Sequence, residues 1–279
     1  MRILLTISLI TFLSFNLVAQ RQISGEKVIE MIRTGKTVAL DNYVINGPLD
    51  FTTIDESFKQ EESGFFERFF TNNDYKNYSY DVEIPVNFNN CKFNGPVIAY
   101  YHNGNSTYNA NFTKAAIFSN CRFSDEAAFK YSHFDGEVDF SGSVFDEEGL
   151  FKYAQFKEGA DFSDAVFNDV ANFKYAKFPE EVNFQKVMFN NYTDFKYVTF
   201  PNQVNFEDAI FEEEANFKYT HFSDGVTFGD AIFSGFANFK YTEFSKPLDL
   251  DKVQFSGHTD FKYTKVDGME FNRFLLTQQ

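Results

Sequence analysis

The sequence has no tryptophan, only two cysteines, four histidines and six prolines. Two cysteines in 279 residues exclude a small disulfide-stapled scaffold. The histidines are isolated, and no histidine–carboxylate cluster has the spacing of metal ligands. A serine-nucleophile motif and a glycine-rich phosphate loop are absent as well. The sequence therefore predicts a protein that is not an enzyme and that has no catalytic residues, no cofactor and no metal.

Basic residues are also in short supply. The 25 lysines and arginines are outnumbered by 40 aspartates and glutamates, which gives a net charge of -15 at pH 7. A chain of this sign repels phosphate backbones and anionic lipid surfaces. We therefore expect no direct contact with nucleic acid or anionic lipid. We also expect no stable membrane insertion after cleavage of an N-terminal signal.

Long hydrophobic runs are missing except at the start of the chain. Met1-Arg2 precedes an uncharged run over 3–17, and Val18-Ala19-Gln20 follows it. This pattern predicts a signal peptide over 1–19, because the run is short for a membrane span and a small residue precedes the expected cleavage point. No cysteine stands there to carry a lipid. We expect export to the periplasm, the cell surface or the medium, with a retained signal anchor as the alternative.

Phenylalanine is abundant, with 40 copies, and it is strictly periodic. The tripeptide Phe-Lys-Tyr recurs every 22 residues, starting at Phe129, Phe151, Phe173, Phe195, Phe217, Phe239 and Phe261. A strict period places every copy at the same point of a stacked unit and predicts a solenoid. Apart from the signal peptide and a capping helix, we expect one repeat domain over 38–279.

Further phenylalanines divide each repeat into steps of five and six residues. From Phe112 to Phe261 there are 28 such corner positions, and only Leu250 is not phenylalanine. The residue two positions earlier is small, β-branched or aliphatic, and in an extended chain it shares the inner face with the corner residue. Steps of five and six leave no apolar stripe on a helix, so an all-β coil with stacked phenylalanine columns is predicted. A tryptophan N–H would have no partner on the axis of such a coil.

The residues around each corner carry a family resemblance. A corner phenylalanine preceded by a small residue and by Asn or Asp, as in Ala171-Asn172-Phe173, resembles the pentapeptide-repeat family. The match is close over about 110–266 and interrupted over 38–109. The resemblance implies a right-handed quadrilateral parallel β-helix and, together with the leader, an exported bacterial member. Phenylalanine in place of the usual leucine implies a fuller core, and the six-residue units imply looser alternate bends.

The first half of the chain fits the same register with two insertions. Phe51 and Ala99 align with the column of Phe129, so inserted loops are expected at about 55–80 and 102–109, both leaving from the same corner. The longer loop carries Phe65, Phe66, Phe69 and Phe70 among acidic residues. Loops that gather on one face of a solenoid are often binding elements, and the alternative is that these rings pack against the coil wall.

Both ends of the array need protection, because an open solenoid end exposes a sheet edge. Ser24 is a suitable N-cap for a helix over 25–34 that Gly35 would end, which predicts a capping helix within 20–37. At the other end the spacing breaks at Met269, and Phe274-Leu275-Leu276 predict either a weak cap or a dimer contact.

Cys91 and Cys121 each precede a corner by two residues on neighbouring coils. A separation of about 4.8 Å is compatible with a disulfide, and export would permit oxidation. The other interpretation is that both are buried thiols filling positions normally held by small residues.

The second and third residues of Phe-Lys-Tyr form two surface ladders. The lysine ladder includes Lys174, Lys196 and Lys218, and the tyrosine ladder consists of Tyr131, Tyr153, Tyr175, Tyr197, Tyr219, Tyr241 and Tyr263. The tyrosines are interpreted either as a contact surface for a glycan or peptide or as a stack that stiffens this face.

The sequence thus predicts an exported, non-catalytic solenoid that binds or scaffolds a protein or glycan of the cell envelope. The alternative comes from the family resemblance, because some cytoplasmic members resemble B-form DNA in shape and acidity and protect type II topoisomerases. The leader argues against it, and an intact Met1 on protein in the cytosol would restore it.

Overall fold

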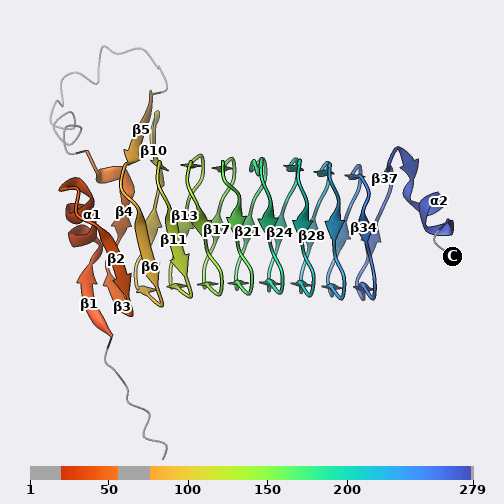
Figure 1. Ribbon diagram of the computed structural model, residues 1–279, viewed down its shortest axis with the longest axis horizontal. Coiled ribbons are helices and arrows are strands. Elements are labelled where there is room, and N and C mark those ends of the chain that lie inside the picture. Colours follow the sequence, from red (N-terminus) through yellow and green to blue (C-terminus); the bar gives the residue numbers. More distant parts are fainter. Residues whose placement is uncertain (1–19, 56–75, 278–279) are drawn as a thin grey trace, which may run out of the picture.

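The structure is a computed structural model and describes residues 20–55 and 76–277. Its repeats form a straight rod, with α1 (Gly25–Arg33) at one end and α2 (Phe271–Leu276) at the other (Figure 1). Nearly all other elements are strands, and successive coils stack along the long axis (Figure 1). The predicted leader over 1–19 lies outside the described residues and stays a prediction.

Four walls of parallel strands enclose the rod. Face A contains β1 (Arg21–Ser24), β3 (Tyr43–Asn46), β7 (Lys92–Phe93), β12 (Arg122–Phe123), β16 (Val144–Phe145), β20 (Val166–Phe167), β23 (Met188–Phe189), β27 (Ile210–Phe211), β31 (Ile232–Phe233) and β35 (Gln254–Phe255). Face B contains β2 (Val38–Asp41), β6 (Val86–Asn89), β11 (Ala116–Ser119), β15 (Val138–Asp139), β19 (Ala160–Asp161), β22 (Val182–Asn183), β26 (Val204–Asn205), β30 (Val226–Thr227) and β34 (Leu248–Asp249). Face C contains β4 (Leu49–Asp50), β8 (Val97–Ile98), β13 (Ala127–Ala128), β17 (Gly149–Leu150), β21 (Ala171–Asn172), β24 (Thr193–Asp194), β28 (Ala215–Asn216), β32 (Ala237–Asn238) and β36 (Thr259–Asp260).

Face D is built from two sheets. The first contains β5 (Lys76–Val82), β9 (Tyr100–Asn103), β10 (Ser106–Phe112), β14 (His133–Phe134) and β18 (Gln155–Phe156). The second contains β25 (Thr199–Phe200), β29 (His221–Phe222), β33 (Glu243–Phe244), β37 (Lys265–Val266) and β38 (Met269–Glu270). Isolated bridges through Lys177 join them, so the wall is continuous. The chain visits faces C, D, B and A in turn, which confirms the predicted quadrilateral parallel β-helix.

The core consists of stacked phenylalanine columns, as predicted. Phe173 and Phe195 lie one coil apart with ring centroids 5.0 Å apart and planes 3° from parallel. Phe184, in the next column, meets Phe195 edge to face at 5.3 Å and 80°. Both arrangements are favourable for aromatic quadrupoles, and each fully buried ring contributes on the order of 1.5–3 kcal/mol. The repeat thus maintains a continuous aromatic interior along the regular array.

The predicted N-terminal helix is present and one residue shorter than expected. The Ser24 hydroxyl accepts a hydrogen bond from the Lys27 amide at 3.1 Å, and Gly35 has a φ of 65° just beyond the helix. Its buried face is Val28, Ile29 and Ile32. β1, which precedes it and pairs with β3, was not expected within 20–37. Strand and helix together cover this end of the core.

The C-terminal end has a more definite cap than the broken spacing indicated. β38 folds back antiparallel onto β37, and in α2 the Phe271 ring stacks on Phe261 at 4.3 Å. Leu276 at 72% and Phe255 at 37% stay exposed here. The dimer contact expected at this end stays a prediction.

The two insertions differ from the expected loops. Strand β5 begins at Lys76, inside the segment expected as a loop at about 55–80, and 102–109 belongs mostly to the β9–β10 hairpin. β5 and β10 pair in register from Lys76 and Ser106 to Val82 and Phe112, which satisfies backbone groups that a loop would leave to water. The two strands protrude beside the rod near α1 (Figure 1). Both insertions do leave from one corner, between faces C and D.

η1 (Phe51–Thr53) follows β4 at this corner. The Arg33 side chain donates hydrogen bonds to the Thr53 and Ile54 carbonyls and so ties helix α1 to it. Phe51 is fully buried and meets Phe112 edge to face at 5.0 Å, as its predicted corner position requires.

Candidate functional site

The corner between faces C and D carries the lysine–tyrosine ladder, defined as the seven Lys-Tyr pairs from Lys130-Tyr131 to Lys262-Tyr263. Every tyrosine of the ladder has a left-handed backbone, with φ between 60° and 64°. The turn needs this conformation because the next residue returns to the inner face: Ala176 N donates to the Phe173 carbonyl at 2.9 Å. A left-handed φ is unfavourable for a bulky residue, by roughly 1–3 kcal/mol.

A second left-handed column lies half a coil away, between faces B and A. It carries residues of a different kind: Asn42, Asn90, Asn120, Gly142, Asp164, Lys186, Asp208, Asp230 and Lys252. Asparagine, aspartate and glycine are the residues that tolerate this backbone best. The turn therefore does not require tyrosine, and the choice of tyrosine at seven successive ladder positions needs another explanation.

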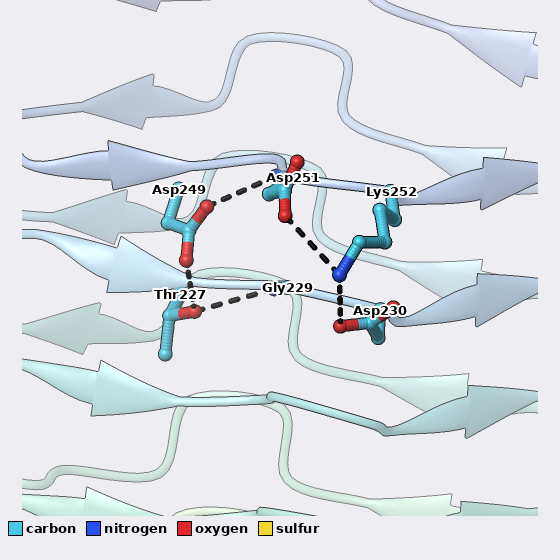
Figure 2. Close-up of polar contacts among 6 residues, drawn as sticks. All are labelled: Thr227, Gly229, Asp230, Asp249, Asp251 and Lys252. Atoms are coloured by element: carbon cyan, nitrogen blue, oxygen red, sulfur yellow. Dashed lines mark hydrogen bonds and ion pairs between the residues drawn. The ribbon is translucent and has the colours of Figure 1, made fainter.

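Side chains of the second column interact as ordinary surface charges. Figure 2 shows Lys252 reaching Asp230 on the preceding coil at 3.5 Å, beside the Asp249 and Thr227 side chains that hold the turns. Asp249 accepts a hydrogen bond from the Asp251 amide at 2.9 Å and another from the Thr227 hydroxyl at 2.9 Å. Exposed pairs of this kind contribute about 0–1 kcal/mol.

In the lysine–tyrosine ladder the rings stack on one another. Successive tyrosine centroids lie 4.8–5.0 Å apart and successive planes are 2–19° from parallel. Each ring from Tyr153 to Tyr241 therefore has a parallel neighbour on both faces. Tyr197 is nonetheless 39% exposed. Because the faces are covered, the ladder presents ring edges and phenol groups to solvent.

Each lysine of the ladder lies beside its own tyrosine. The Nζ atoms are 4.9–5.4 Å from the ring centroids of the tyrosines that follow them, within the range of a cation–π interaction. Burial lowers the pKa of Lys152, and the neighbouring Lys174 and Lys130 lower it further. The charges thus repel one another along the row.

Carboxylates near the ladder include Asp194 and Asp260 on face C and Glu148, which acts on Lys152. Asp194 on face C has a raised pKa because it is buried, although Lys174 and Lys196 act against that shift. Its Oδ1 accepts a hydrogen bond from the Lys196 amide at 2.9 Å, as Asn216 Oδ1 does from Lys218 at 3.2 Å. From Phe173 onward, the Asn or Asp before each corner phenylalanine therefore braces the backbone under the ladder.

The N-terminal end of the ladder meets the insertions, which the sequence did not indicate in detail. Register alone assigns Tyr101 to the tyrosine column, but Tyr100 makes the contact, at 5.7 Å from Tyr131. Lys130 Nζ donates to the Tyr100 hydroxyl at 3.1 Å. Tyr78 and Tyr108 stack beyond it at 4.9 Å. The hairpin β9–β10 bends the chain away, so periodicity could not identify these partners.

Two grooves flank the walls. One on face B has a volume of about 610 Å³ and is lined by carboxylates that include Glu137, Asp139 and Glu158. The other, on face D, has a volume of about 410 Å³ and a more apolar lining that includes Phe156, Phe178 and Pro179. Both are open and run across several coils, from Glu137 to Thr227 on face B and from His133 to Pro201 on face D.

The cysteines and histidines singled out in the sequence do not form a second functional site in the described part of the chain. Cys91 and Cys121 are buried free thiols that donate to backbone carbonyls, Cys91 to Leu40 at 3.4 Å and Cys121 to Phe88 at 3.4 Å, and burial raises the pKa of Cys121. The disulfide between them stays a prediction. His221 pairs with Glu243 at 3.2 Å, and within residues 20–55 and 76–277 no group of histidine, cysteine and acidic side chains could hold a metal. Phe65, Phe66, Phe69 and Phe70 lie outside the described residues.

No helix in the described part of the chain is both long and apolar enough to cross a bilayer. No curated protein and no solved structure matches the chain. A family model described as pentapeptide repeats (9 copies) matches residues 108–149, 151–199, 195–243 and 217–265. These matches cover more than half of the sequence and coincide with the regular coils. The chain therefore belongs to the pentapeptide-repeat family.

Proposed function

We propose that this protein is an exported, non-catalytic solenoid whose lysine–tyrosine ladder is the contact surface for a protein or glycan of the cell envelope. The observation that supports it is the choice of tyrosine at seven left-handed positions, while the equivalent corner varies among asparagine, glycine, aspartate and lysine. Stacking offsets part of the conformational cost, but it does not explain why every exposed edge is a phenol beside an ammonium group.

The rigidity of the coil suits a binding role. The ladder backbone is fixed by hydrogen bonds between coils, such as Tyr175 N to the Lys196 carbonyl at 3.2 Å. A surface that is already ordered loses little conformational entropy when a partner binds. The protruding strands β5 and β10 stand at the same corner, so they can contribute to the same contact.

The test compares two variants that change matched positions. The ladder variant replaces Tyr175, Tyr197 and Tyr219 by asparagine, which accepts the left-handed backbone. The control replaces Asp164, Lys186 and Asp208 by asparagine in the second column. Both are incubated with envelope fractions of the source organism, and sedimented protein is measured. The proposal expects the ladder variant alone to lose retention, and equal retention of both would contradict it.

The acidic groove on face B favours a second candidate, the DNA-mimic role. A row of carboxylates on a straight rod can occupy a surface that otherwise binds a phosphate backbone. This function requires a cytoplasmic protein, so the N-terminal residue of protein from the native cell decides between the two. Inhibition of supercoiling by a type II topoisomerase, lost when Glu137, Asp139 and Glu158 become glutamine or asparagine, would support it.

A further inference from the structure

The geometry of the ladder limits the kinds of ligand that it can bind. Base stacking and sugar stacking both need an open aromatic face. Each tyrosine from Tyr153 to Tyr241 has both faces covered by parallel rings at 4.8–5.0 Å. A ligand therefore meets hydroxyl groups and ring edges, which excludes the stacking mode that single-stranded nucleic acids and uncharged sugars use.

The groups that remain available are hydrogen-bonding and cationic. Phenol hydroxyls both donate and accept, and lysine ammonium groups donate three hydrogen bonds. The lysine row is cationic within a chain of net charge -15. Burial lowers the pKa of Lys152, and the charges of Lys174 and Lys130 lower it further than Asp194 or Glu148 raises it. An anionic ligand would relieve the repulsion along this row.

The regular spacing of the Lys-Tyr pairs restricts the possible ligands further. Seven equivalent Lys-Tyr pairs follow one another at one coil each, on a straight axis (Figure 1). Equivalent subsites in a row fit a polymer with equivalent units, whereas the surface of a folded protein without repeats offers no such spacing. One sugar of an extended polysaccharide has a length comparable to the rise of one coil, about 4.8 Å.

On these grounds, and resting on the proposed function, we propose that the ladder binds a linear acidic polysaccharide along the solenoid axis. Uronate carboxylates pair with the lysine ammonium groups, and sugar hydroxyls exchange hydrogen bonds with the phenols. Each pair is at least partly exposed and offers few contacts by itself, so affinity comes from several pairs acting on one chain.

The experiment measures binding of the full-length protein to polygalacturonate by calorimetry, with the neutral methyl ester of the same polymer as the matched ligand. Polygalacturonate should bind, the ester should not, and affinity should increase with oligosaccharide length until the ladder is filled. Affinity should also fall as salt rises, because exposed ion pairs are screened. Equal binding of the two polymers, or no binding of the acidic one, would overturn the proposal.

Three variants assign the site. Replacing Lys174, Lys196 and Lys218 by glutamine should lower affinity by about tenfold or more. Replacing Lys92, Lys114 and Lys186 by glutamine removes the same charge from other places and should leave affinity within about twofold. Replacing Tyr175, Tyr197 and Tyr219 by phenylalanine retains the ring stack and the fold, and it should weaken binding through the lost hydroxyls. An equal effect of both lysine variants would contradict the assignment to the ladder.

Other polyanions test the choice of polymer. Polyglutamate or single-stranded DNA binding the ladder more tightly than polygalacturonate would show that the ligand class is wrong. The proposed function is judged separately, by envelope retention. If retention depends on the ladder but polygalacturonate does not compete for it, this inference fails and the proposed function stands. If retention does not depend on the ladder, the proposed function itself fails.

Discussion

Tyr175 and Lys186 have the same left-handed backbone, with φ of 60° and 56°, at two corners half a coil apart. One position recurs as tyrosine in every regular coil, and the other varies among asparagine, glycine, aspartate and lysine. The two corners impose the same conformational demand, so the difference between them reflects what their side chains do. At one corner the rings form a continuous stack, and at the other the side chains carry scattered surface charges.

Replacing ladder tyrosines should change the stability of the protein only slightly. Asparagine at Tyr175, Tyr197 and Tyr219 relieves backbone strain but removes the stacked rings, so we expect a change of less than about 1 kcal/mol per site. Serine at the same positions loses the rings without favouring the left-handed backbone and should be less stable than asparagine. Denaturant unfolding of both triple variants measures this. Equal stabilities would show that the backbone conformation carries no strain.

The aromatic columns should be strongest in the middle of the rod. Phe195 is fully buried between Phe173 and Phe217 at 5.0 and 5.1 Å, so Phe195→Ala should reduce the free energy of unfolding by about 3–5 kcal/mol. Phe255 lies near the end of the rod and is 37% exposed, so Phe255→Ala should reduce the free energy of unfolding by much less. Urea unfolding provides the comparison. Similar losses at the two sites would be incompatible with a stacked column that cannot collapse.

Asp194 gives a pH-dependent prediction. Burial raises the pKa of this carboxyl, so at neutral pH its ionised form costs stability, and the cost disappears as pH falls below its folded pKa. Asn172 and Asn216 hold the equivalent positions on the neighbouring coils. Asp194→Asn should therefore raise the melting temperature at pH 7, and the gain should shrink towards about pH 4.

The matched control for this variant is Asp260→Asn, the same position in the last coil, where the carboxyl is half-buried. Its effect on the melting temperature should be smaller. A decrease in stability of Asp194→Asn at pH 7 would mean that the attraction of the Lys174 and Lys196 charges outweighs the burial of Asp194.

The two thiols should be unreactive while the protein is folded. Cys91 and Cys121 are 2% and 1% exposed, so a reagent reaches neither sulfur atom in the folded protein, and burial also raises the pKa of Cys121, which leaves that residue little thiolate. A thiol reagent should label both only on unfolding. Cys121→Ala should be tolerated within about 1.5 kcal/mol, because Ala165 and Ala209 occupy the same column. Rapid labelling of the native protein, or a mass two hydrogens lower before reduction, would contradict this.

The repeat in the sequence was sufficient to predict the coil, its four sides and its core. A phenylalanine every five or six residues, preceded by a small residue, has only one arrangement that buries all the rings, so Phe112 and Phe195 could be placed without coordinates. Ser24 and Gly35 likewise marked the N-terminal helix, because capping depends on residues adjacent in the chain.

The tertiary structure decided what lies between coils and outside the repeat. The tyrosine rings cover one another's faces because rings 22 residues apart in the sequence have nearly parallel planes. No local sequence pattern encodes that orientation. The strands β5 and β10 form because they find each other across an insertion, and Tyr100 rather than Tyr101 meets Tyr131 because the hairpin redirects the chain. Periodicity fixes positions that recur, whereas contacts at the ends and insertions depend on which distant segments come together in space.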